Sequence, residues 1–391
     1  MEDQRPVCYN TDQNYRFDME RSNMSIFSKN RLMPYIKKIT GVPAGENEVT
    51  YHEDSGVYTN ENKINYHEDS GVYTIKTAND DFRILQLTDI HLGGTIFSYG
   101  RDKKALMACE KLIRASQPDL VIVTGDLTYP MRGPMFSYDN KRLARTFAAF
   151  MRRMGVPWAF TFGNHDSEVR AVLDGKNLSR LFAAISKKDQ CLLYPLKQPN
   201  ISGRNNQLIE IRNTDGSIRQ ALFLLDSHAY TDEVSRKYDH IHDDQVEWYR
   251  NTVLQLNREQ GETVSSLVFL HIPLQQYRTA YELYQANSEE VRYFFGFNKE
   301  KGYGKVCCAD DPSALFDTAK ELGSTKGFFC GHDHYNNMSL EYEGIRLTYG
   351  MSIDYLVMRG IAHKNEQRGG TVITCRRDTT IEIEQLPLAE I

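Results

Sequence analysis

The segment FRILQLTDIHL, residues 82–92, decides the fold because an apolar run of strand length ends in polar, metal-capable side chains. Residues 82–88 have the composition of a β-strand. Asp89 and His91 follow and are two positions apart, so in an extended segment both side chains point the same way. The segment therefore predicts a strand that carries a carboxylate and an imidazole at its end.

The same arrangement recurs four times along the chain. Predicted strands at 120–124, 158–162, 267–270 and 328–330 end in Gly125-Asp126, Gly163-Asn164-His165-Asp166, His271-Ile272-Pro273 and Gly331-His332-Asp333-His334. A glycine precedes Asp126, Asn164 and His332, which lets the chain turn sharply and leaves room beside the site. In open α/β sheets, ligands bind outside the carboxyl ends of the strands. We therefore expect the five strand ends to converge on one site.

The remaining periodicity predicts an α/β domain. Helices are expected at 103–116, 140–154 and 244–259, and a fourth is expected to open at Asp311-Pro312 and end at Gly323. Further strands are expected at 221–225, 344–348, 371–375 and 380–384. Alternating strands and helices followed by a β-rich tail favour mixed sheets, for example a two-sheet sandwich with helices on its outer faces.

Seven side chains form the candidate metal-ligand set. They are Asp89, His91, Asp126, Asn164, His271, His332 and His334. Imidazole, carboxylate and carboxamide together suit Mn²⁺, Fe²⁺ or Zn²⁺ better than Ca²⁺. Seven ligands exceed the four of a single tetrahedral zinc but suffice for two ions if one carboxylate is shared. Each motif alone is weak, since Gly-Asp is usually a turn, so the prediction depends on the ordered set of five.

That ordered set resembles the calcineurin-like metallophosphoesterase superfamily, whose pattern runs Asp-x-His, Gly-Asp, Gly-Asn-His-Asp/Glu, His and Gly-His-x-His. The resemblance covers roughly residues 80–360. Three segments are similar to the purple-acid-phosphatase-like branch and its bacterial relatives: Leu87–Gly94, Thr124–Thr128 and Phe329–Tyr335.

The resemblance implies a four-layer α/β/β/α sandwich with mixed sheets and two divalent metal ions, Mn, Fe or Zn. It implies that Asp126 bridges the ions, with one ion also held by Asp89, His91 and His334 and the other by Asn164, His271 and His332. His165 would contact the phosphate and help the leaving group depart.

The activity implied by the resemblance is hydrolysis of a phosphate ester, with a hydroxide that bridges the two metals as nucleophile. The expected partner is a phosphorylated substrate, a small molecule, and either a monoester or a diester fits. Two alternatives stay open: hydrolysis of pyrophosphate bonds in nucleotides or lipid precursors, and a non-catalytic metal- or phosphate-binding protein of the same fold.

Several neighbouring residues are given secondary roles. Tyr129 has the spacing of an iron-ligating tyrosine in purple acid phosphatases, but His91 is present as well, so we expect Tyr129 to be a pocket wall. Asp166 is expected to cap the following helix rather than orient His165. His228 is expected to be structural. The aromatic-rich segment 276–308 either covers the site or packs as a subdomain.

Composition limits the function classes. A formal net charge of −5 over 391 residues does not indicate general nucleic-acid binding, and no apolar run is long enough to span a membrane. The N-terminus lacks the pattern of a secretory signal, and the seven cysteines match no disulfide framework, so we expect a cytoplasmic protein. Residues 1–78 are predicted to be a polar region of unknown role with a near-repeat at 51–59 and 66–74, and residues 79–391 the catalytic domain.

Overall fold

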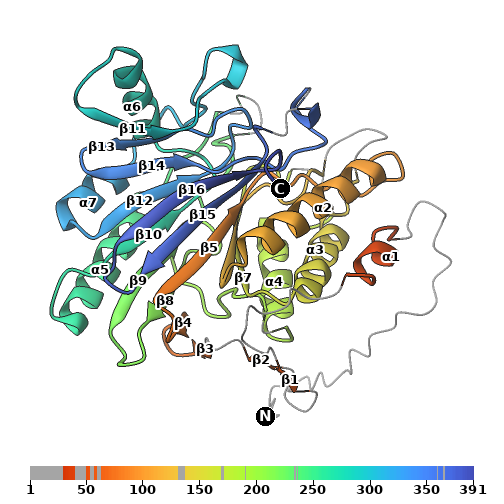
Figure 1. Cartoon of the computed structure of the whole chain (residues 1–391), viewed down its shortest axis with the longest axis horizontal. Coiled ribbons are helices and arrows are strands. Elements are labelled where there is room, and N and C mark those ends of the chain that lie inside the picture. Colours follow the sequence, from red (N-terminus) through yellow and green to blue (C-terminus); the bar gives the residue numbers. More distant parts are fainter. Residues whose placement is uncertain are drawn as a thin grey trace, which may run out of the picture.

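The structure is a computed structural model in which two β-sheets lie face to face with helices on their outer sides (Figure 1). It describes residues 30–39, 50–52, 57–59, 63–130, 137–168, 171–189, 191–232, 235, 237–358, 360–363 and 366–391.

The smaller sheet has five strands. Its order is β16 (Ile381–Pro387), β15 (Gly369–Arg376), β5 (Asp81–Leu87), β6 (Leu120–Thr124) and β7 (Trp158–Thr161). Strands β5, β6 and β7 are parallel, whereas β15 pairs antiparallel with both β5 and β16. The sheet is therefore mixed, as the sequence predicts, and the C-terminal strands complete it beside β5.

The larger sheet has nine strands. Its order is β11 (Val291–Phe295), β13 (Ser339–Tyr342), β14 (Ile345–Tyr349), β12 (Thr325–Cys330), β10 (Ser266–Phe269), β9 (Ile218–Leu224), β8 (Gln207–Arg212), β4 (Val72–Lys76) and β3 (Lys63–His67). The four central strands from β14 to β9 are parallel. A separate two-stranded ribbon consists of β1 (Thr50–His52) and β2 (Val57–Thr59).

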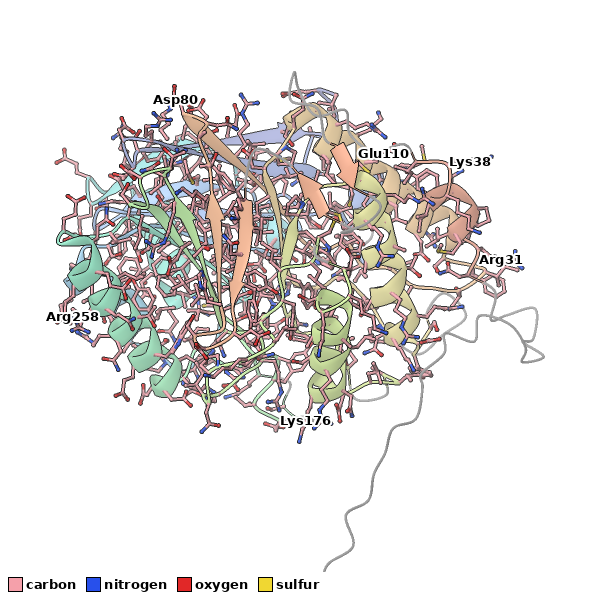
Figure 2. All side chains as sticks on the ribbon, turned by 90° about the horizontal axis from the view of Figure 1, so that it is seen from below. Arg31, Lys38, Asp80, Glu110, Lys176 and Arg258 are labelled. Atoms are coloured by element: carbon pink, nitrogen blue, oxygen red, sulfur yellow. The ribbon has the colours of Figure 1, made fainter. Side chains whose placement is uncertain are left out.

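Three buried apolar clusters separate four layers. The outer face of the five-stranded sheet packs against α2 (Tyr99–Ser116), α3 (Asn140–Met154) and α4 (Gly175–Ser186), and α1 (Met33–Ile36) packs on α3. The nine-stranded sheet packs against α5 (Asp243–Gln260), α6 (Gln275–Gln285) and α7 (Leu315–Leu322). The third cluster lies between the two sheets. This confirms the predicted α/β/β/α sandwich, and Figure 2 shows Arg258 on α5 and Lys176 on α4 at opposite sides of the strands.

Strand β6 shows why its sequence is continuously apolar. Leu120 and Ile122 point into the cluster between the sheets, while Val121 and Val123 point toward the helices. Because successive side chains alternate between two buried faces, every position from Leu120 to Val123 is apolar.

The helix predictions hold best where caps are clear. The side chain of Asp139 accepts the Arg142 N–H at 2.9 Å to start α3, and Gly155 ends that helix with a φ of 73°. The prediction that a helix opens at Asp311-Pro312 is wrong, since α7 begins at Leu315. The Ser313 hydroxyl accepts the Leu315 N–H at 3.3 Å, so the helix starts after that turn. None of the described helices is long and apolar enough to cross a membrane.

The near-repeat forms the same hairpin twice. Tyr51 pairs with Tyr58 in the first copy, and Tyr66 pairs with Tyr73 at the equivalent position of the second. Strand β4 also pairs in parallel with β8, so the second copy extends the nine-stranded sheet. The domain boundary at residue 78 stays a prediction, but part of the region before it contributes strands to the main fold.

Candidate metal centre

The predicted ligand residues lie in loops at the carboxyl ends of strands from both sheets. Strands β5, β6 and β7 are parallel neighbours in one sheet, and β10 and β12 are parallel neighbours in the other, so within each sheet these carboxyl ends lie side by side. Hydrogen bonds join the sheets there. The Gln86 amide donates to the Cys330 carbonyl at 3.0 Å, and His271 Nδ1 donates to the Thr124 carbonyl at 2.8 Å. The structure thus brings the five strand ends together.

Asp89, His91 and His334 form the first donor group. All three are buried, and one ligand atom of each lies within 4.8 Å of the others. Asp89 Oδ1 is 3.4 Å from His334 Nε2 and 3.8 Å from His91 Nε2. Within the described residues this oxygen has no hydrogen-bond partner, although it is fully buried. A buried carboxylate oxygen facing two imidazoles is a suitable place for a cation.

Asp126, His271 and His332 form the second donor group. His271 Nε2 is 3.2 Å from Asp126 Oδ2 and 3.1 Å from Asn164 Oδ1. Asp126 Oδ2 is also 3.1 Å from His91 Nε2 in the first group. Asp126 therefore lies between the two groups, where a shared carboxylate is needed.

The tautomers at this site favour a cation. His271 Nδ1 donates to a carbonyl, and His334 Nδ1 donates to the Asp354 carboxylate at 2.9 Å. In the neutral form of each ring, the Nε2 lone pair faces the oxygen of Asp126 or Asp89, so acceptors point at acceptors unless Nε2 carries a proton or a metal ion lies between them. A positive charge between them removes this conflict, and the donor set fits divalent ions.

The electrostatics agree with the geometry. Burial alone raises the pKa of Asp126, but His271 and His165 outweigh it and hold the pKa well below its usual range. Burial lowers the pKa of His271, but the Asp126 carboxylate raises it to about 9. For His332, burial and then His271 lower the pKa well below its usual range. The pKa values of both Asp89 and Asp126 are lowered, so the two carboxylates stay ionised and create a site that attracts cations.

Four of the seven predicted ligands have left-handed backbone. The φ angles are 53° for Asp89, 52° for His91, 52° for Asp126 and 76° for His332. Such a conformation costs a residue with a side chain about 1–2 kcal/mol. Strain of this kind is concentrated at functional sites, where the surrounding structure enforces it.

A glycine permits the closest approach. A Cβ added to Gly163 would lie 2.2 Å from Asp126 Oδ1 and 2.3 Å from Asp126 N. The space that the sequence predicts beside this glycine is therefore filled by the Asp126 carboxylate.

His165 lies beside the two donor groups. Its backbone N–H donates to Asp126 Oδ1 at 2.8 Å, and its ring Nδ1 is 2.8 Å from Glu168 Oε1.

The prediction that Asp166 caps the next helix is wrong. Its carboxylate accepts N–H groups of Asp126, Thr128 and Gly163, and α4 is capped by Asp174 instead. The motif at 163–166 thus folds back toward the end of β6, and the Asp166 carboxylate holds the loop after that strand by these hydrogen bonds.

Sequence reasoning missed the residues that hold the ligands in place. Asp354 orients His334, Glu168 binds His165, and the Tyr230 hydroxyl accepts from Asn164 Nδ2 at 2.9 Å. Asp354 comes five residues after the end of β14, a strand that includes Arg346 and Thr348, so no strand-end signal marks it.

Aromatic rings line the centre. Tyr129 stacks on His91 at 5.2 Å between ring centroids and meets the His165 ring edge-on at 4.6 Å. Tyr238 meets His332 edge-on at 4.5 Å. These contacts place Tyr129 where a pocket wall is expected.

The aromatic segment 276–308 packs with the domain core. It supplies β11 to the edge of the larger sheet, and the hydroxyl of buried Tyr277 in α6 donates to the Phe328 carbonyl at 2.8 Å. A short 3₁₀ helix, η1 (Glu300–Gly302), follows, and a second one, η2 (Ile361–His363), lies near the C-terminus. Tyr277 and β11 therefore fit the packing alternative, whereas Tyr293 and Tyr303 of the same segment are exposed.

A protein-family model described as calcineurin-like phosphoesterase matches residues 82–336. The chain belongs to the calcineurin-like phosphoesterase family. The match includes all five motifs, and the resemblance seen in the sequence is confirmed. Membership of the calcineurin-like phosphoesterase family implies a dinuclear centre of divalent ions and a phosphorylated substrate.

Individual relatives carry different names. The chain is 29% identical over 303 residues to "Probable inactive purple acid phosphatase 14" of Arabidopsis thaliana, covering 70% of this chain and 71% of the relative. It is 26% identical to "Phosphatase DCR2" of Saccharomyces cerevisiae, covering 70% of this chain and 48% of the relative. A dimetal phosphatase structure from Danio rerio aligns with a TM-score of 0.49 and 12% identity, covering 78% of this chain and 96% of that one.

Proposed function

We propose that this protein hydrolyses phosphate esters at a dinuclear metal centre. The observation that supports this best is the position of Asp126, which lies 3.1 Å from His91 and 3.2 Å from His271 and so links two donor groups. In this proposal Asp89, His91 and His334 complete one ion's ligands.

The second ion's ligands are Asn164, His271 and His332, with Asp126 shared. When bound, two divalent ions would neutralise phosphoryl oxygens and lower the pKa of a water between them. Mn, Fe and Zn suit these ligands. The chain itself sets where each ligand atom lies, because second partners orient His334, His271 and Asn164.

His165 is the proposed general acid. Its Nδ1 is held by Glu168, so Nε2 is the nitrogen left to protonate the leaving alkoxide. A positioned general acid contributes typically about 10²–10⁴-fold in rate. Tyr129 packs on the same imidazole and limits its rotation.

The proposed substrate is a phosphorylated small molecule, and hydrolysis of p-nitrophenyl phosphate and bis-p-nitrophenyl phosphate tests this. Protein stripped of metal is refilled with Mn²⁺, and Asp126→Asn serves as the control. Metal-dependent turnover that the variant lacks supports the proposal, and the preferred ester separates monoesterase from diesterase activity. Absence of bound metal in the refilled protein would contradict it.

The names of the Arabidopsis relatives favour a second candidate, a non-catalytic protein that binds metal or phosphate. The same assay separates the two. Two bound ions without turnover of either ester or of a pyrophosphate substrate indicate the binding role, whereas turnover of pyrophosphate alone indicates a pyrophosphate hydrolase.

A further inference from the structure

A third group of metal-capable side chains lies between β9 and α5, apart from the two donor groups. One ring nitrogen each of His228 and His242 and a carboxylate oxygen of Asp239 lie within 4.8 Å of one another. The two imidazole rings stack with centroids 4.3 Å apart, and His242 Nε2 is 3.1 Å from Asp239 Oδ1. None of these residues belongs to the five motifs.

The surroundings fix the tautomer of His228. The Gln245 side-chain NH₂ donates to the Asp226 carbonyl and to Asn206 Oδ1, both at 2.8 Å. Its Oε1 must therefore be the atom 2.9 Å from His228 Nε2, and this nitrogen donates. His228 Nδ1 then keeps its lone pair, as a metal-binding imidazole requires.

Asp239 is prepared as a ligand, with a further imidazole beside it. Asp239 Oδ1 accepts the His240 backbone N–H at 2.8 Å and lies 3.1 Å from His242 Nε2. His240 Nδ1 lies 3.2 Å from the same Oδ1. That nitrogen is buried and makes no hydrogen bond to any residue that the structure describes.

We propose that His228, Asp239 and His242 bind a third divalent ion. Two imidazoles and one carboxylate are nitrogen and oxygen ligands that Zn²⁺ takes, and a tetrahedral site with three protein ligands keeps its fourth position open. The three residues are distinct from the ligands of the dinuclear centre, so the inference does not depend on the proposed function.

The third ion would close the base of a loop that reaches the dinuclear centre. His228 and Asp239 stand at the two ends of this loop, where the Asp239 N–H donates to the Ala229 carbonyl at 3.2 Å. Just inside these ends, Tyr230 accepts from Asn164 and Tyr238 contacts His332. An ion joining the ends would hold both tyrosines against the centre.

Metal counting on a protein without a working dinuclear centre provides the test. The full-length Asp89→Asn/Asp126→Asn protein is stripped with chelator, incubated with Zn²⁺ and desalted, and its zinc is measured by mass spectrometry. Adding His242→Gln should remove about one bound ion per chain. Adding His67→Gln, a matched loss of an exposed histidine on β3, should remove none.

Two further readouts protect against misfolding. Co²⁺ should give visible absorption bands of a tetrahedral site that the His242→Gln and His228→Gln variants each lack. Zn²⁺ should raise the unfolding temperature of the background protein but not of these variants, whose temperatures without metal should equal that of the background. Equal zinc content and equal cobalt spectra in all four proteins would overturn the inference. Zinc lost from the His67→Gln protein as well would also overturn it.

Discussion

Asp354 is not a candidate metal ligand, but its carboxylate orients His334 in the centre. Its buried carboxylate accepts four hydrogen bonds. Oδ2 accepts from His334 Nδ1 at 2.9 Å and from the Met358 N–H at 2.7 Å, and Oδ1 accepts from the Leu356 and Val357 N–H groups at 2.7 and 2.8 Å. Asp354→Asn keeps the shape but replaces one oxygen with a donor. Whichever way the amide turns, its NH₂ faces two N–H groups.

The magnitude follows from those lost acceptors. If the amide NH₂ faces Leu356 and Val357, two N–H donors lose their partner, and at about 1–3 kcal/mol each this costs about 2–6 kcal/mol of unfolding free energy. If it faces His334 and Met358, His334 can accept from the amide, so one N–H donor is lost at about 1–3 kcal/mol, and the His334 proton moves to Nε2, the nitrogen that faces Asp89. Loss of such a supporting carboxylate typically weakens metal binding about 10–100-fold.

Two measurements check this prediction. Urea unfolding of metal-free protein gives the free-energy change, and Mn²⁺ titration gives the affinity. Asp310→Asn, a substitution of an exposed aspartate, is the control and should change stability by less than about 0.5 kcal/mol. An Asp354→Asn protein with the stability and Mn²⁺ affinity of the control would refute the role of this carboxylate.

Three further predictions follow from the centre. Gly163→Ala should lower kcat/KM by about 10²-fold because the new Cβ displaces Asp126, whereas Gly175→Ala, with no neighbour closer than 3.4 Å, should not; equal rates would contradict this. Glu168→Gln should lower kcat by up to about 10²-fold with unchanged metal content, since it weakens the hold on His165; lost metal would indicate a different role. Chelation should lower the unfolding temperature, because ligands at 100 times their Kd stabilise by about 2.7 kcal/mol, and a scan showing no shift would count against bound metal.

The sequence was most informative where a motif followed a strand. Asp89 and Asp126 were found because buried strands end directly before them, and chain direction alone brings parallel strand ends together. Asp166 could not be placed in this way. Its carboxylate reaches back to N–H groups after β6, and only the folded loop shows that these donors are there.

Other features were missed. Helices α4 and α6 were not predicted, although apolar residues recur at helical spacing in both, and Phe182 and Tyr277 are buried in clusters formed by distant segments. The link between Asn164 and Tyr230 joins residues 66 positions apart, and no local spacing announces such a pair.

The position of the centre between two sheets has a consequence for how the protein can vary. Asp89 and Asp126 follow strands of one sheet, and His271 and His332 follow strands of the other; the apolar cluster between the sheets, together with hydrogen bonds such as that from Gln86 to Cys330, keeps the halves aligned. Metal ligands tolerate displacements of only about 0.5 Å. Sliding of one sheet over the other would therefore abolish metal binding long before it unfolded the protein. A substitution in the apolar cluster between the sheets can therefore reduce metal binding as well as stability.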